Sequence, residues 1–113
     1  MKKDSLVYID DIVDCVNAIK KYTRGFSKEK FFKNPEKQDA VYYRIGLIGE
    51  AANKLSEDFI KKYSQIPWSK IIAMRNKIIH DYDEVDPNLI WRVAKKDIPE
   101  LEKQLKNIEG VDF

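Results

Sequence analysis

The residues best suited to do chemistry in this chain lie in one short stretch, residues 75–82, with the sequence RNKIIHDY. His80 is the only histidine of the chain, and an imidazole with an unperturbed pKa of about 6.5 can give or take a proton near neutral pH. Arg75 carries a permanent charge and a planar fork of N–H donors, which suits the binding of a phosphate. This pair of residue types indicates acid–base chemistry at a phosphate group.

Arg75 stands where a helix is expected to be apolar. If residues 68–82 form an α-helix at about 100° per residue, Arg75 falls near the middle of an apolar stripe. The other members of that stripe are Trp68, Ile71, Ile72, Ile79 and Tyr82. A guanidinium is costly to bury unpaired, so Arg75 needs a carboxylate, a partner chain or an anionic ligand.

Each of these residues also has an ordinary structural interpretation. Arg75 could form a salt bridge inside the bundle with a carboxylate such as Glu50. His80 could lie near a helix C-terminus, where the helix dipole favours its charged form. Asn76 could be a plain polar helix position, and Tyr82 a boundary aromatic with its hydroxyl in water.

The spacing of the four residues sets a geometric condition. His80 follows Asn76 by four positions and shares a helix face with it, while Tyr82 lies about 20° around the helix from Arg75. Arg75 and His80 are five apart and diverge by about 140° on an ideal helix. They would meet at one small ligand only if the helix loosens near its end or a second chain completes the site.

Composition predicts one soluble globular domain, residues 1–113, with 43% hydrophobic and 35% charged residues. No apolar run approaches the roughly 18 residues of a membrane helix and no signal peptide opens the chain, so we expect a cytoplasmic protein. Cys15 is the single cysteine, there is one histidine, and neither an EF-hand nor a glycine-rich phosphate loop is present. No metal or other cofactor is therefore predicted.

The net charge of +2, from 21 basic and 19 acidic residues, is too small to make nonspecific nucleic-acid binding the dominant property. Basic residues do cluster locally: Lys20, Lys21 and Arg24; Lys28, Lys30 and Lys33; Lys61 and Lys62; Lys95 and Lys96. Most are expected on solvated helix faces, and a few could lie beside an RNA path that the sequence does not locate.

The apolar spacing is helical throughout, which predicts an all-α, up-and-down helical bundle. Caps and prolines place helix starts at Asp4 or Ser5, at Asn34-Pro35, at Pro67-Trp68 and at Asp86-Pro87, and Gly25 ends the first helix. Ser56 is expected to cap a brief turn. The aromatics of the segment after Gly25 are expected to cap the core; they are Phe26, Phe31 and Phe32.

Two features concern how the helices pack. The second long helix is expected to bury one stripe, to keep Glu50 and Asn53 on its polar side, and to allow close helix contact at Gly46 and Gly49. That stripe is Val41, Ile45, Ile48, Ala52 and Leu55. Pro99 should kink or divide the last helix. The core stripe predicted there is Ile90, Val93, Asp97, Leu101, Leu105 and Ile108.

Three segments carry a resemblance to a known family. They are IPWSKIIAMRNKIIHDYDEVD (66–86), QDAVYYRIGLIGEAANKLSEDF (38–59) and VAKKDIPELEKQL (93–105). They resemble HepT-like proteins of the HEPN superfamily, whose motif is R-x-x-x-x-H-x-Y. The arginine–histidine spacing alone is weakly specific, whereas its combination with Asn76, the tyrosine and the segment IGEAAN is strongly specific.

The resemblance implies a homodimeric, metal-independent ribonuclease toxin of a type VII toxin–antitoxin system. It also implies a minimal nucleotidyltransferase antitoxin of the MntA type, which transfers AMP to the motif tyrosine, here Tyr82. The implied catalytic pair is Arg75 and His80, with Asn76 in support, and Glu50 is a second predicted supporting residue.

RNA cleavage by the 2′-hydroxyl needs a base, an acid and a cation at the phosphate. A twofold dimer that apposes the helices beginning at Pro67-Trp68 would bring two histidines and two arginines into one cleft. The alternative from another class is a non-catalytic helical module that binds a nucleotidyltransferase, in which Arg75 is a structural or interface ion pair.

Overall fold

The computed structural model describes residues 4–80 and 86–113. These residues form helices and connecting turns with no β-strand among them, which confirms the all-α prediction. In chain order the elements are α1 (Ser5–Thr23), α2 (Lys28–Phe32), α3 (Pro35–Ala52), α4 (Glu57–Lys62), α5 (Trp68–His80), α6 (Pro87–Arg92), the π-helix η2 (Val93–Asp97) and α7 (Ile98–Leu105).

Short polar side chains fix the helix starts. Asp4 accepts a hydrogen bond from the Leu6 N–H at the start of α1, and Asn34 accepts one from the Lys37 N–H at the start of α3. Ser27, Ser56 and Asp86 cap α2, α4 and α6 in the same way. Just beyond α1, Gly25 adopts φ +76°, a left-handed conformation that few other residues accept. The predicted boundaries at Asp4, Gly25, Asn34, Ser56 and Asp86 are confirmed, whereas the cap at Ser27 was not predicted.

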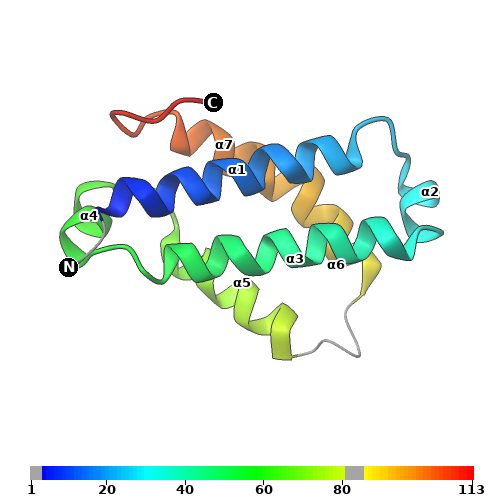
Figure 1. The fold of residues 1–113 in the computed structure, drawn as a ribbon. Coiled ribbons are helices and arrows are strands. Elements are labelled where there is room, and N and C mark those ends of the chain that lie inside the picture. Colours follow the sequence, from blue (N-terminus) through cyan, green and yellow to red (C-terminus); the bar gives the residue numbers. More distant parts are fainter. Residues whose placement is uncertain (1–3, 81–85) are drawn as a thin grey trace.

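The long helices α1 and α3 run antiparallel, side by side, as Figure 1 shows. Helix α5 packs on α3, and the connected arm α6–η2–α7 returns along α1. A shared apolar core lies between these elements. Its largest fully buried side chains include Ile9, Ile12, Ile19, Phe31, Ile45, Ile48, Ile66, Ile78, Ile98 and Leu105.

The segment after Gly25 only partly fulfils its prediction. Phe31 is fully buried and Phe26 is half-buried against the core, but Phe32 is 36% exposed. The segment also contains the short helix α2, because Ser27 caps it. Phe31 and Phe32 are neighbours on this helix, about 100° apart, so one faces inward while the other faces out.

The last helix is divided near Pro99, as predicted, but the division takes the form of a π turn. The Ile98 N–H donates to the Val93 carbonyl, five residues back, in the turn that precedes the proline. This wider turn moves the next core position by one residue. Ile98 is therefore buried and Asp97 is exposed, so the prediction of Asp97 in the core stripe was wrong.

A membrane-spanning helix is not found in the described part of the chain, since none of its helices is both long and apolar enough.

Candidate active site

Helix α5 is anchored at its start by Trp68. The indole N–H of Trp68 donates to the Tyr63 carbonyl at 3.2 Å, and its ring centroid lies 6.4 Å from that of Phe59. Trp68 and Ile71 are buried, as the predicted stripe requires, and Ile78 is also buried, which that stripe did not include. The burial of Ile79 and the position of Tyr82 lie outside what the structure describes.

The side chain of Arg75 packs against α3 at Gly49. A methyl group on Gly49 would overlap Cβ and Cγ of Arg75, so a larger residue at position 49 would have to push the two helices apart. The expected close contact is thus found at Gly49. It is not found at Gly46, where a methyl group would meet no atom within 4 Å.

The guanidinium of Arg75 is only partly satisfied. Its Nη1 donates to Oδ1 of Asn76 at 2.8 Å, whereas its buried Nε has no hydrogen-bond partner within residues 4–80 and 86–113. No carboxylate of those residues pairs with Arg75 either. A buried donor without a partner is unfavourable, so this cation is left with capacity for an anion.

The structure does not bring Glu50 into an ion pair with Arg75. Glu50 is exposed and lines a groove of about 280 Å³ between α1 and α3, together with Tyr8 and Arg44. Glu50 follows Gly49 by one position, which turns its side chain about 100° around α3 away from the contact with α5. The structural reading of Arg75 as the partner of Glu50 therefore has no support in the described residues.

His80 is the last residue of α5 and is exposed to solvent. The helix is regular up to this residue, so no loosening within α5 brings His80 toward Arg75. Asn76 is half-buried one turn earlier, with its Oδ1 already bound to Arg75. The structure thus joins Arg75 to Asn76 and leaves His80 apart from them, at the C-terminal end of α5.

Tyr42 supports the end of α5 and was missed by sequence reasoning. Its hydroxyl donates to the Ile78 carbonyl at 3.3 Å, in the last turn of α5. Tyr42 and Gly49 are seven residues apart and therefore share one face of α3. That spacing was the available signal for a shared contact surface with α5.

The described residues offer little support for a metal site or a reactive thiol. They contain no group of three His, Cys, Asp or Glu side chains placed to hold a metal ion. Cys15 is buried, and burial raises the pKa of its thiol above the usual range, which disfavours the reactive thiolate.

Fold and site together define a class: an all-α bundle that presents an arginine and a histidine, five residues apart, near the end of one helix. Comparison with known proteins supplies the family. The family model described as "Ribonuclease HepT-like" matches residues 12–108, and the chain belongs to this HepT-like ribonuclease family.

Individual relatives agree with this assignment. The chain is 33% identical to "Probable ribonuclease HepT" of Thermococcus cleftensis, over 96% of this chain and 98% of that protein. It is 36% identical to a protein of Methanocaldococcus jannaschii named as a candidate RNase, over 98% of this chain and 95% of the relative. A second M. jannaschii relative, named as a gamma-glutamylcyclotransferase and candidate RNase, is 41% identical over 99% of this chain. The chain spans about half the length of that relative, 51%. No solved structure matches the chain.

Proposed function

We propose that this chain is a metal-independent endoribonuclease whose single domain, residues 1–113, cleaves RNA by attack of the 2′-hydroxyl. The observation that carries the proposal is Arg75, which is half-buried beside α3 and whose guanidinium pairs with no carboxylate of the described residues. A scissile phosphate supplies the anion that this group lacks.

In this reaction the 2′-oxygen bonds to the adjacent phosphorus and the bond from phosphorus to the next 5′-oxygen breaks. His80 takes the proton of the 2′-hydroxyl or gives a proton to the leaving 5′-oxygen. Arg75 stabilises the charge that develops on the phosphorane oxygens, and Asn76 holds the guanidinium through its 2.8 Å hydrogen bond. The products carry a 2′,3′-cyclic phosphate and a 5′-hydroxyl.

A homodimer completes the site. A regular α5 keeps Arg75 and His80 about 140° apart, so one helix does not present both groups to one small ligand. A second copy, related by a twofold axis with the α5 helices apposed, places the His80 of one protomer beside the Arg75 of the other. It also provides two imidazoles, one as base and one as acid.

The test is cleavage of a labelled RNA by purified protein in the presence of a chelator. We expect His80→Ala and Arg75→Ala to abolish cleavage while the helical circular dichroism signal and the dimer remain. Arg44→Ala is the matched control, because Arg44 faces the other side of α3, and it should leave cleavage intact. Full cleavage by His80→Ala would overturn the proposal. Product ends without a cyclic phosphate would overturn the 2′-hydroxyl mechanism.

The proposed biological setting is the toxin of a type VII toxin–antitoxin system in the cytoplasm. The phenol oxygen of Tyr82 attacks the α-phosphorus of ATP on a cognate minimal nucleotidyltransferase, and pyrophosphate leaves. The AMP group adds bulk and negative charge two residues from His80, which repels RNA phosphates. Support for this setting comes from the motif spacing and the family.

Intact-mass measurement after co-expression with a minimal nucleotidyltransferase of the MntA type tests the switch. One or more AMP-sized additions are expected on the wild type and none on Tyr82→Phe. Additions that persist on Tyr82→Phe would contradict the assignment. Induction of the chain alone separates a nuclease from a non-catalytic binding module, because only a nuclease should arrest growth in a His80-dependent way.

A further inference from the structure

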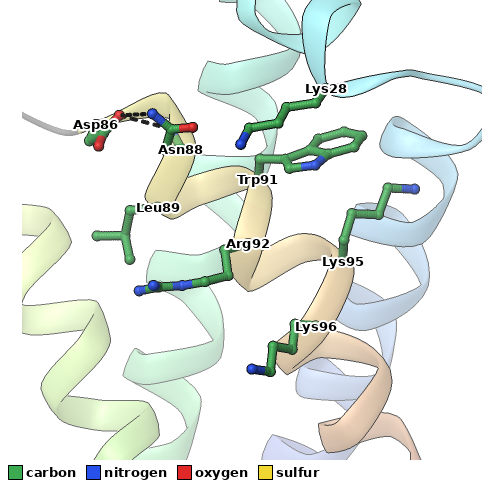
Figure 2. Close-up of a pocket in the computed structure, with 8 residues that line it drawn as sticks. All are labelled: Lys28, Asp86, Asn88, Leu89, Trp91, Arg92, Lys95 and Lys96. Carbon is green, nitrogen blue, oxygen red and sulfur yellow. Dashed lines mark hydrogen bonds between the residues drawn. The ribbon is translucent and has the colours of Figure 1, made fainter.

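Basic residues that are far apart in the sequence line one groove. The groove has a volume of about 490 Å³ and opens where α2 meets α6 and η2 (Figure 2). Lys28 of α2 lines one side of it, and Arg92 of α6 with Lys95 and Lys96 of η2 lines the other, the side chains of Arg92 and Lys95 pointing to opposite sides in Figure 2. Trp91 lies between them.

The charge of this groove is largely uncompensated. Four cations line it against one carboxylate, that of Asp86. Asp86 is already engaged, since its Oδ1 accepts from the Asn88 backbone N–H at 2.9 Å and from the Asn88 side chain at 3.2 Å. The ion pairs found in the described residues all involve Glu102, so none of them neutralises a groove cation. Such a surface favours an anionic ligand.

One wall of the groove is held in place. The Trp91 ring lies 5.1 Å from the buried ring of Phe31. The Lys95 ammonium lies 5.1 Å from the Trp91 centroid and donates to the Thr23 carbonyl at 3.1 Å, so Lys95 turns toward the end of α1. Arg92 and Lys96 remain exposed and are four residues apart along the arm. A row of cations beside an aromatic side chain suits a single-stranded polyanion better than an isolated phosphate.

The groove is also within reach of the proposed active site. Its edge at Asp86 follows His80 by six residues, and six residues span at most about 20 Å. A strand with its scissile phosphate at His80 therefore reaches the groove within a few nucleotides. We propose that this groove binds the backbone of single-stranded RNA that flanks the cleavage point. The inference rests on the proposed ribonuclease function and adds a second substrate contact to it.

The test measures binding without cleavage. A fluorescent single-stranded RNA with every 2′-hydroxyl methylated lacks the nucleophile, so its anisotropy reports affinity alone. The variant is Arg92→Gln/Lys96→Gln. The matched control is Lys61→Gln/Lys103→Gln, which removes the same charge from exposed lysines that do not line the groove. Trp91 gives a second readout, because the other tryptophan, Trp68, is only 3% exposed.

The groove variant should bind the RNA roughly 10- to 30-fold more weakly near 0.1 M salt. The slope of log affinity against log salt should become shallower by about 1.4, since each phosphate contact on a single strand contributes about 0.7. The control variant should match the wild type, and RNA should alter the fluorescence of Trp91. Equal affinity and slope in the wild type and the groove variant would overturn the inference.

Two further outcomes separate this inference from the proposed function. If the wild type binds the RNA through the groove but cuts no unmodified RNA, the nuclease proposal fails and the groove assignment stands. If the groove variant keeps its RNA affinity and instead loses binding to the acidic polypeptide poly-glutamate, the groove is a protein contact and the inference fails.

Discussion

Two arginines lie on different sides of α3, Arg44 of α3 itself and Arg75 of α5, and they differ in how many of their N–H groups have partners. Arg44 lies on the side toward α1, where hydrogen bonds with Cys15 and Tyr22 raise the pKa of its guanidinium. Arg75 lies on the side toward α5, with its stem against Gly49 and a buried Nε that finds no partner in the described residues. The first arginine is accounted for by the fold, whereas the second needs a ligand.

The largest expected effect comes from replacing each arginine with methionine, which keeps the length of the side chain but removes its charge. Arg75→Met should lower RNA cleavage by about 10²–10³-fold, as loss of a donor at the reacting oxygens does, without lowering the free energy of unfolding. Arg44→Met should leave cleavage unchanged and lower that free energy by about 0.5–1.5 kcal/mol. Single-turnover cleavage and urea unfolding measure both quantities. The comparison fails if Arg44→Met is the more damaging to cleavage.

The two glycines of α3 give the next largest contrast. Gly49→Ala forces a methyl group onto Arg75 Cβ and Cγ, so we expect the free energy of unfolding to fall by about 1–3 kcal/mol and cleavage to fall with it. Gly46→Ala meets no atom within 4 Å and should raise the free energy of unfolding by about 0.5–1 kcal/mol, because alanine favours a helix over glycine. Thermal and urea unfolding measure the difference. Equal effects of the two substitutions would show that Arg75 does not pack against Gly49.

These contrasts show what the sequence could predict. Helix starts were predictable because their causes are local: Asp4, Asn34 and Asp86 each cap a helix within three residues of themselves. The misplaced Arg75 predicted that a partner was needed, because burial of an unpaired guanidinium is costly in any fold.

What remained out of reach depends on how elements meet. Glu50 is adjacent to Gly49 in the sequence but points to the groove beside α1, and only the packing of α3 decides which of the two faces Arg75. Ile98 and not Asp97 is buried because of the π turn. That turn is a backbone adjustment before Pro99, which apolar spacing does not predict. The basic groove joins Lys28 to Lys95 and Lys96, and no local pattern connects those clusters.

A smaller effect is expected where α3 supports the end of α5. Tyr42→Phe removes the hydroxyl that donates to the Ile78 carbonyl and should lower the free energy of unfolding by about 0.5–1.5 kcal/mol. Amide hydrogen exchange should become faster in the last turn of α5 before His80, while the α1 amides keep their protection. Tyr43→Phe is the control, because Tyr43 is 61% exposed on the same helix. Unchanged exchange in Tyr42→Phe would remove Tyr42 from the support of the site.

The smallest effect is expected away from the contact between α3 and α5, where α1 packs against α7. Lys20 Nζ lies 2.7 Å and 2.9 Å from the two carboxylate oxygens of Glu102, and these hydrogen bonds lower the pKa of Glu102. A lowered folded-state pKa means that the pair stabilises the fold above the unfolded pKa, about 4.3, and that this stabilisation is lost as the pH falls through the folded pKa. Lys20 is 40% exposed, so solvent screening limits the contribution to about 1 kcal/mol or less.

Urea unfolding at pH 7 and at pH 3 isolates that contribution by difference. Glu102→Gln removes the titrating group, so its free energy of unfolding should fall less between pH 7 and pH 3 than that of the wild type. Glu100→Gln, at an exposed position in the same helix, should keep the wild-type pH dependence. Cleavage at pH 7 should be equal in all three proteins, because the α1–α7 contact does not position α5. A wild-type pH dependence in Glu102→Gln would show that the Lys20 pair contributes nothing. A loss of cleavage in Glu102→Gln would show that the α1–α7 contact and the α5 site are coupled. The contrast between Arg44 and Arg75 requires that they be independent.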